Sequence, residues 1–403
     1  MHVHMPLIVT LAVALGLSLI LGFVASRLGL PALVGYLLAG VLIGPHTPGF
    51  VADVGLANQL AEVGVMLLMF GVGLHFSLDD LLAVRRIAVP GAVVQMIFAT
   101  AMGAGLAMWW GWSPAGALVF GISLSVASTV VLLRALEARN LVDTVNGRIA
   151  VGWLIVEDLA MVLVLVLLPV AVGVMQPEAA GGAAGEGSGW ELFTMVVKTL
   201  LAVAAFVAVM LIGGRRFLPW ALWQISKTGS RELFTLCVVA AAVGIAYGAA
   251  ALFGVSVALG AFFAGLVLRE SEFSHRAAAE SLPLRDAFAV LFFVSVGMLF
   301  DPAVLLERPL QVLAVTLIIV TGKSIAALLL VLALRYPLST GLTVSTSLAQ
   351  IGEFSFILIA LGASLGVVPD EARSLVVAGA LLSMALNPLF FTLNEPLRHW
   401  LLR

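Results

Sequence analysis

Charged residues are scarce in this 403-residue chain. Asp, Glu, Lys and Arg make up only 10% of it, whereas 62% of the residues are hydrophobic. A soluble domain carries about 25% charged residues, so most of the surface of this chain cannot face water. The net charge is −2 and no block of basic residues occurs, so the sequence gives no indication of a nucleic-acid partner. The composition predicts a membrane protein.

Cysteine is nearly absent as well. The single Cys237 excludes an internal disulfide framework and any metal site built from several cysteines. The sequence also lacks a Walker phosphate loop, an HExxH motif and a nucleophile elbow. These absences exclude the enzyme classes that the motifs define. We therefore expect a protein that is not an enzyme and that holds no cofactor in this chain.

Long apolar runs, in contrast, fill the sequence. A helix needs about 20 apolar residues to cross the hydrocarbon core of a bilayer. Dividing the chain at its charged, proline-rich or glycine-rich punctuation predicts thirteen spans. They cover residues 6–26, 31–48, 57–76, 87–109, 114–136, 147–173, 191–213, 232–249, 252–269, 284–301, 308–334, 338–364 and 372–393. The predicted fold class is an all-α polytopic membrane protein with about thirteen transmembrane helices.

The distribution of basic residues predicts the orientation. Sixteen of the 20 Lys and Arg residues fall in the loops after odd-numbered spans or in the C-terminal tail. Cytoplasmic loops carry the excess of Lys and Arg in membrane proteins. We therefore expect the N-terminus outside and the C-terminus inside.

A segment rich in glycine and alanine, 174–190, predicts a flexible external linker. It separates a first six-span repeat (1–173) from a linking helix (191–213) and a second repeat (232–393). Because one span intervenes, the second repeat starts from the opposite face of the membrane. We therefore predict a single membrane transport domain, 1–403, with two inverted repeats, an arrangement common in secondary transporters.

Two adjacent carboxylates, Glu157 and Asp158, interrupt the sixth span. Asp158 lies ten residues beyond Arg148, which corresponds to about 15 Å of helix and places it near the bilayer midplane. Removal from water favours the protonated form of a carboxyl group, and a nearby cation favours the charged form. A carboxylate held there binds a proton or a metal cation in competition, which is the minimum mechanism for exchange. The alternative is a buried acid that is permanently paired with a base.

Lys323 lies at the centre of the eleventh span. An unpaired ammonium group in hydrocarbon is costly, so we expect Lys323 to pair with an acidic residue. Glu157 and Glu353 are equal candidates. Since adjacent residues on a helix point about 100° apart, Glu157 and Asp158 need not share one site. We expect one of the two to bind the ion and the other to meet a basic partner.

The fifth and twelfth spans contain polar clusters, GISLSVASTVVLL and STSLAQIGEFSF. Broken helices in matching positions of inverted repeats frame ion sites by presenting freed carbonyls and helix ends. We predict that both spans are broken and that Ser128, Thr129 and Gln350 supply neutral oxygens beside Asp158. The alternative is that these side chains bond the preceding turn or join neighbouring helices.

Seven strings, in this order along the chain, resemble a known family. They are GYLLAGVLIGP (35–45), LMFGVGL (68–74), SVASTVVLLRALEARN (125–140), GRIAVGWLIVEDLA (147–160), ALGAFFAGLVL (258–268), FFVSVGM (292–298) and AQIGEFSFIL (349–358). The chain resembles the monovalent cation:proton antiporters of the second subgroup. Within it, the closest likeness is to the Kef-type, glutathione-regulated potassium-efflux antiporters and their YbaL-like members. The resemblance covers essentially the whole chain.

The resemblance implies specific roles for these residues. It places the proton and the K⁺ or Na⁺ ion at Asp158, and the crossing unwound helices at Ser128–Thr129 and Gln350–Glu353. Kef proteins carry Gln before this Asp, where this chain has Glu157. Electrogenic relatives pair the first of two acids with a Lys on the tenth helix. The tenth span here, 284–301, contains no Lys, so that feature does not carry over and the stoichiometry stays open.

The resemblance also implies partners. It implies a homodimer surrounded by lipid in the bacterial cytoplasmic (inner) membrane, and a loop between the ninth and tenth spans that contacts a regulatory domain. In this chain that loop is 269–286, with Glu272, His275, Arg276 and Glu280 as candidate contacts. A solvated connector is the equal alternative. Relatives commonly continue into a cytosolic nucleotide-binding domain. This chain ends at Arg403 without a GxGxxG motif, so we expect no nucleotide site before residue 403.

Taken together, these features favour a secondary active K⁺/H⁺ antiporter that works by alternating access. The transported ions, K⁺ or Na⁺ and H⁺, take the place of cofactors. Three alternatives stay open: a Na⁺/H⁺ antiporter, a regulated cation channel or leak, and a non-transporting membrane sensor.

Overall fold

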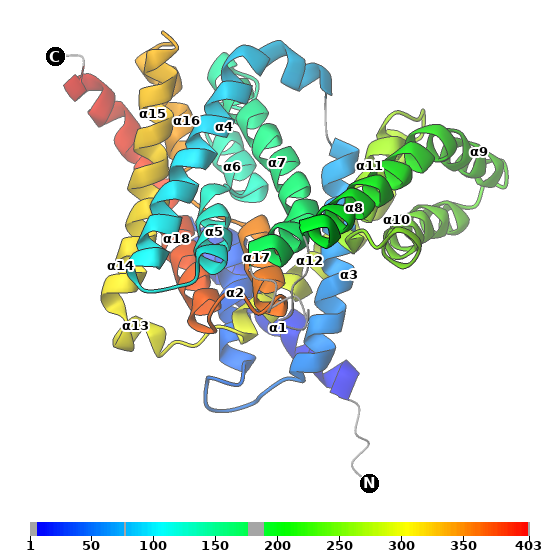
Figure 1. The fold of residues 1–403 in the computed structure, drawn as a ribbon, viewed down its shortest axis with the longest axis horizontal. Helices are drawn as coiled ribbons and strands as arrows, with labels where there is room; N and C mark the ends of the chain where they lie inside the picture. Colours follow the sequence, from blue (N-terminus) through cyan, green and yellow to red (C-terminus); the bar gives the residue numbers. More distant parts are fainter. Residues whose placement is uncertain (1–5, 76–77, 176–188, 402–403) are drawn as a thin grey trace. The chain divides into compact units, whose positions relative to one another are not determined.

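The computed structural model describes residues 6–75, 78–175 and 189–401, and helices are its only regular secondary structure in these ranges (Figure 1). The helices are α1 (Pro6–Arg27), α2 (Ala32–Ile43), α3 (Val54–His75), α4 (Leu78–Trp109), α5 (Pro114–Ser125), α6 (Thr129–Glu137), α7 (Val145–Met175), α8 (Gly189–Val209), α9 (Arg215–Ser226), α10 (Arg231–Phe253), α11 (Val257–Arg269), α12 (Ser274–Met298), α13 (Val304–Glu307), α14 (Pro309–Leu317), α15 (Lys323–Ala333), α16 (Leu338–Ser347), α17 (Glu353–Ser364) and α18 (Glu371–Leu401). Two π-helical turns, η1 (Met210–Gly214) and η2 (Ile318–Gly322), join α8 to α9 and α14 to α15.

Among the described residues, eight helical segments are long and apolar enough to cross a membrane. They are Pro6–Arg27, Val54–Leu74, Leu82–Trp109, Leu201–Ser226, Arg231–Phe253, Ser274–Met298, Pro309–Ala333 and Glu371–Asn394. Shorter apolar helices include α2, α5, α11 and α17. The prediction of an all-helical, multi-pass membrane protein is therefore confirmed. The number thirteen, the inverted repeats and the orientation stay predictions.

The chain divides into two compact units. The first contains residues 1–10, 53–77 and 162–295, and the second contains residues 11–52, 78–161 and 296–403. The first unit is thus built mainly from α3 and from α8 to α12, and the second from α2, α4 to α6 and α13 to α18. Because α1, α7 and α12 run through the division, neither unit corresponds to one of the predicted repeats, whose boundaries stay predictions.

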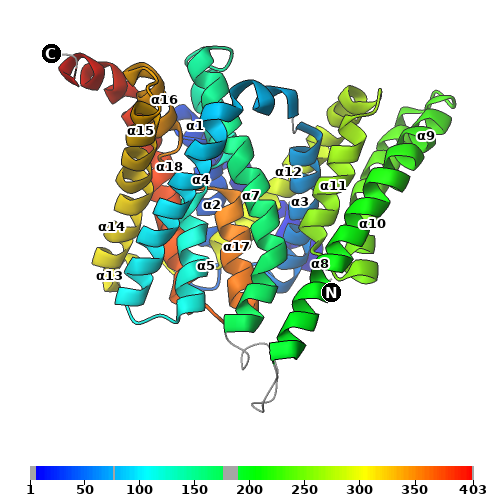
Figure 2. The same ribbon diagram turned by 45° about the horizontal axis from the view of Figure 1, so that its top comes forward.

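The second unit contains two interrupted helices. α5 ends at Ser125 and α6 begins at Thr129, while α16 ends at Ser347 and α17 begins at Glu353. The breaks predicted in the fifth and twelfth spans are therefore confirmed. α5 packs against α4 and lies beside α17, and α15 packs against both α4 and α16 (Figure 2).

In the first unit, α3 and α11 pack closely through small residues. A methyl group added at Gly73 would lie 2.8 Å from the backbone N of Leu266, and one added at Gly265 would lie 2.9 Å from the backbone N of Leu74. Both separations are far inside van der Waals contact. Glycine lets the two backbones approach, which is how helices associate in a medium as apolar as their own side chains.

The predicted end of the seventh span at residue 213 is wrong. The helix continues through η1 into α9 and ends at Ser226, so Arg215 and Arg216 lie on a helix and not in a loop. Leu218 and Leu222 are buried on one face of α9, while Trp220 is exposed. Long arginine side chains carry their charge away from an apolar surface toward water. A charged pair can therefore mark the edge of the hydrocarbon without ending the helix.

The predicted loop 269–286 is also mostly wrong. α11 ends at Arg269 and α12 already begins at Ser274, which leaves only 270–273 as a turn. The run SHRAAAESLPLRD is charged, but Ala, Glu, Arg and Leu are strong helix formers. The polar residues of this segment therefore indicate that the chain has left the hydrocarbon core, but the chain is still helical there. Most of the predicted linker 174–190, namely 176–188, lies outside the described residues, so that prediction stays untested.

We expect Gly73→Val to destabilise the protein by about 1–3 kcal/mol, because the larger side chain forces α3 away from α11. The measurement is the thermal unfolding midpoint in detergent. Gly244→Val on α10 is the matched control, because a methyl group at Gly244 meets nothing within 4 Å. Equal midpoints for the two variants would contradict the packing described here.

Candidate functional site

The two helix breaks of the second unit lie against each other at Ser128 and Gly352. A methyl group at Gly352 would lie 2.6 Å from the Cα atom of Ser128. The Gln350 side chain joins the two breaks: the backbone N–H of Ser128 donates to Gln350 Oε1 at 2.8 Å, and Gln350 Nε2 donates to the Ser128 carbonyl at 3.2 Å. The Gln350 amide thus supplies the acceptor that the Ser128 N–H lacks at the break, while the Ser128 carbonyl also accepts from the Leu132 N–H of α6 at 3.1 Å.

The Ser128 side chain acts at both breaks. Its hydroxyl accepts a hydrogen bond from the Val131 N–H at 3.4 Å, which makes Ser128 the N-cap of α6. The same hydroxyl donates to Glu353 Oε2 at 3.0 Å. Glu353 is buried and is the first residue of α17, where the positive end of the helix dipole favours a negative charge.

Glu157 and Asp158 of α7 reach the first break from the side. The Glu157 side chain is 0% exposed, and its Oε2 accepts from the backbone N–H of Ala127 at 2.9 Å. Asp158 is 6% exposed, and its Oδ2 accepts from the Thr129 hydroxyl at 3.0 Å. The two acids therefore contact residues on opposite sides of Ser128, in agreement with the 100° between neighbours on a helix.

Asp158 keeps one carboxylate oxygen without a protein partner. Among the described residues, Asp158 Oδ1 is buried and receives no hydrogen bond, whereas Glu157 also interacts with the Trp153 side chain. The charges of Glu353 and Glu157 both act on Asp158. Repulsion between like charges and removal from water both oppose three ionised carboxylates in one region. A proton or a monovalent cation at Asp158 relieves both, and carboxylate oxygens are suitable ligands for either.

Lys323 lies between the second break and the acids of α7, where its charge interacts with that of Glu157. It is fully buried, and among the described residues its hydrogen bond runs to a backbone carbonyl, from Nζ to the Gln350 oxygen at 2.9 Å. Its positive charge attracts Glu157, one of the two predicted partners. The Gln350 carbonyl lies in the helix break and lacks an intrahelical donor, so the Lys323 ammonium group satisfies it.

Sequence reasoning missed three buried or half-buried donors around the breaks. Gln95 of α4 donates to the Ser125 carbonyl at 3.1 Å, at the end of α5. Asn387 of α18 donates to the carbonyl of Thr346 at 2.8 Å, near the end of α16. The Ser324 hydroxyl of α15 lies 3.0 Å from the Ser345 carbonyl and 2.6 Å from the Val320 carbonyl, and its one proton is shared between them. An amide side chain in the middle of an apolar span was the available signal for Gln95 and Asn387.

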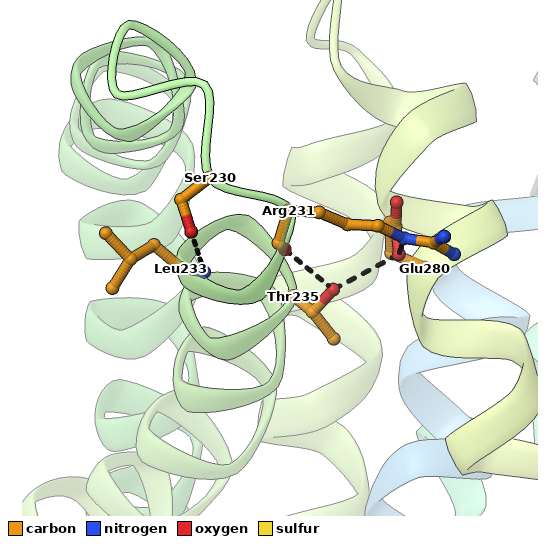
Figure 3. A network of polar contacts seen from close by, with 5 residues as sticks. All are labelled: Ser230, Arg231, Leu233, Thr235 and Glu280. Atoms are coloured by element: carbon orange, nitrogen blue, oxygen red, sulfur yellow. Dashed lines mark hydrogen bonds and ion pairs between the residues drawn. The ribbon is translucent and has the colours of Figure 1, made fainter.

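The predicted regulatory residues lie in the first unit and do not form one cluster. Glu280 of α12 accepts from Arg231 Nε at 2.9 Å and from the Thr235 hydroxyl at 3.2 Å, which ties α12 to α10 (Figure 3). The Arg276 guanidinium lies 4.0 Å from the centre of the Phe234 ring. Glu272 and His275 are exposed. Glu280 and Arg276 therefore join α12 to α10, and Arg276 is exposed like Glu272 and His275.

Comparison with known proteins shows where this geometry belongs. Residues 13–393 match the family described as sodium/hydrogen exchanger, transmembrane. The chain belongs to the sodium/hydrogen exchanger family. This is a transporter family and not a class of enzymes, and the resemblance to cation:proton antiporters is confirmed.

Individual family members cover nearly the whole chain. YbaL from Escherichia coli (strain K12), which carries the provisional description of a cation/proton antiporter, is 58% identical over 398 residues, 98% of this chain and 70% of its own length. K(+) efflux antiporter 4 from Arabidopsis thaliana is 32% identical over 94% of this chain and 62% of its own length. The solved structure of the sodium proton antiporter MjNhaP1 from Methanocaldococcus jannaschii aligns with a TM-score of 0.65 over 97% of this chain and 98% of its own, at 16% identity. This last likeness shows a shared fold.

We expect Gly352→Ala to destabilise the contact between the breaks by about 1–3 kcal/mol, because the added methyl group collides with Ser128 and the backbones must separate. The measurement is the thermal unfolding midpoint of the purified protein in detergent. Gly105→Ala on α4 is the control, since a methyl group there meets nothing within 4 Å. A midpoint for Gly352→Ala equal to that of the control would refute the close approach.

Proposed function

We propose that this chain exchanges a monovalent cation for protons across the bacterial cytoplasmic membrane, with Asp158 as the shared site. The observation that supports the proposal most directly is the buried Asp158 side chain. One of its oxygens is held by Thr129 at a helix break and the other has no hydrogen-bond partner among the described residues. A proton and a cation compete for that oxygen, so binding of one releases the other.

Potassium is the cation that we propose, and sodium is the alternative. The support is the name of the Arabidopsis relative, a K(+) efflux antiporter that is 32% identical to this chain. The sodium antiporter MjNhaP1 shares the fold at 16% identity, which carries no weight for ion choice. Monovalent cations of different size can occupy one carboxylate site, so the number and spacing of the surrounding oxygens decide the selectivity.

Transport through this site requires alternating access. We propose thirteen spans in two inverted six-helix repeats, with the N-terminus outside and the C-terminus inside, and a homodimer as the assembly. The charge asymmetry of the loops supports the orientation. The two interrupted helices support the repeat, because breaks in matching positions of inverted halves let the site open to either side.

Regulation by a cytosolic domain is a further part of the proposal. YbaL and K(+) efflux antiporter 4 are longer than the region that they share with this chain. Glu272 and His275, at the turn between α11 and α12, are exposed, and unlike the exposed Arg276 they make no hydrogen bond, ion pair or cation–π contact with α10 among the described residues. We assign these two residues to partner contact, and Arg276 and Glu280 to the packing of α12 on α10.

Glu157 has a structural role in this proposal. It accepts the freed N–H of Ala127 and faces the charge of Lys323. Both interactions are satisfied without a transported ion. Glu157 and Lys323 therefore stabilise the break between them, and Asp158 alone carries the exchange.

The decisive experiment uses the purified protein in liposomes with an imposed pH gradient. Addition of K⁺, Na⁺ or Li⁺ should move protons, and Asp158→Asn should abolish the movement, because an amide cannot exchange a proton for a cation. The concentration of cation for half-maximal exchange should rise as the pH falls, since protons then compete more strongly. The folded state of Asp158→Asn must be verified by size-exclusion chromatography and circular dichroism.

Other outcomes identify the alternatives. Cation current without coupled proton movement would replace the antiporter by a channel or leak. Binding of a cation without any flux, in the wild-type protein, would indicate a sensor. Exchange that persists in correctly folded Asp158→Asn would refute the assignment of the site.

The role of Glu157 has its own test. Glu157→Gln keeps an oxygen that accepts the Ala127 N–H, so we expect exchange with an unchanged ratio of protons to cations. Glu157→Leu removes the acceptor and leaves the N–H and the Lys323 charge unsatisfied, which should cost about 1–3 kcal/mol of stability or more. A changed ratio in Glu157→Gln, measured from the reversal potential in liposomes, would make Glu157 a second titrating site.

A further inference from the structure

Gln95 is a buried amide in the middle of α4, and both ends of its side chain are engaged. It is 0% exposed, and it lies within the membrane-spanning segment Leu82–Trp109. Nε2 donates to the carbonyl of Ser125 at 3.1 Å, and Oε1 accepts from the indole Nε1 of Trp153 at 3.4 Å. Neither partner is on α4. The amide therefore connects two other elements, α5 and α7.

The first connection replaces a hydrogen bond that the break removes. In a continuous helix the Ser125 carbonyl would accept from the N–H of residue 129. The chain leaves the helix at residues 126–128, so this carbonyl loses its partner at the point where α5 ends. An unsatisfied carbonyl in an apolar medium is expensive. Gln95 supplies the missing donor and fixes the end of α5.

The second connection leads to the helix that bears Asp158. Trp153 precedes Glu157 by four residues on α7, so the two lie on the same face. The Trp153 ring packs against Gly91 of α4, where an added methyl group would lie 2.7 Å from Cε3. The indole is therefore held in place by packing. Gln95 accepts from its N–H and donates to the Ser125 carbonyl, and so links the end of α5 to α7.

Packing between these helices does not depend on Gln95. α4 and α5 also meet through Gly103 and Gly121, where a methyl group added at Gly103 would lie 2.8 Å from the Gly121 Cα atom. Loss of the amide therefore leaves the helices together. It frees the end of α5, and with it the break at residues 126–128 that begins directly after Ser125 and places Ala127 and Thr129 against the two acids of α7.

We propose that Gln95 is a positioning residue for ion exchange, which sets the distance between Thr129 and Asp158 by tying the end of α5 to α7. The inference rests on the proposed function, in which Asp158 is the shared site. The second break offers independent support, because the Asn387 amide of α18 donates to the Thr346 carbonyl near the end of α16, beside the longer bond from the Ala349 N–H. Each interrupted helix thus has a polar donor from a neighbouring helix at its carbonyl end.

The test measures the half-saturating cation concentration in liposomes at several pH values. Gln95→Met removes both hydrogen bonds, and we expect the half-saturating concentration to rise about tenfold, a change within the range that two buried hydrogen bonds contribute. Gln95→Glu can donate to Ser125 only while the carboxyl group is protonated. Its half-saturating concentration should therefore match the wild-type value at low pH and exceed it increasingly as the pH rises.

The matched control is Gln224→Glu, which introduces the same charge at an exposed residue of α9 and should not change the pH profile. Trp153→Phe removes only the indole donor and should raise the half-saturating concentration less than Gln95→Met does. The unfolding midpoints of all variants are measured in parallel.

The inference is overturned by folded Gln95 variants with wild-type half-saturating concentrations at every pH. It is also overturned if both Gln95 variants fail to fold, because the residue then acts on stability alone. Wild-type protein is assayed first. Its failure to exchange would refute the proposed function and not the role of Gln95, and the two results are thereby kept apart.

Discussion

The close approach of two interrupted helices at Ser128 and Gly352 is the constraint on which the rest of the second unit depends. A helix that stops inside a membrane leaves N–H and carbonyl groups that lipid cannot satisfy. Here the side chains of the opposite break and of the neighbouring helices satisfy them. Several of the polar side chains around Asp158 therefore complete the hydrogen bonding of the interrupted backbone.

The two sides of this arrangement differ in charge. The carbonyls near the ends of α5 and α16 accept hydrogen bonds from the neutral amides of Gln95 and Asn387, and the Gln350 carbonyl accepts one from the Lys323 ammonium group. The donors at the first break bind carboxylates instead. The Ala127 N–H donates to Glu157, and the hydroxyls of Thr129 and Ser128 donate to Asp158 and Glu353. The acids outnumber the buried ammonium group. A region with surplus acid in an apolar medium attracts small cations, and a proton is the smallest of them.

The sequence predicts which residues lie at the helix breaks, because the breaks depend on polar residues that an apolar span has no other reason to contain. Ser128, Thr129, Gln350 and Glu353 were identified that way, and the structure places all four at or beside the breaks. Their assignment to ion binding stays a prediction. Helix boundaries were predicted less well, as at Arg215 and Ser274, because charge reports the edge of the hydrocarbon and not the end of a helix. The hydrogen bond of Lys323 to a carbonyl could not be predicted, since it depends on which backbone groups the breaks leave free.

The π-turn η2 has a consequence for the register of its helix. α14, before the turn, packs against α18, and α15, after it, packs against α16 and α4. A residue inserted into or removed from a helix rotates everything beyond it by about 100°. If the turn from Ile318 to Gly322 were wound as a regular α-helix, either α14 would lose its face toward α18 or Lys323 would point away from the break. The extra residue in the π-turn therefore rotates α15 relative to α14. The continuous helix can then pack against α18 before the turn and against α16 and α4 after it.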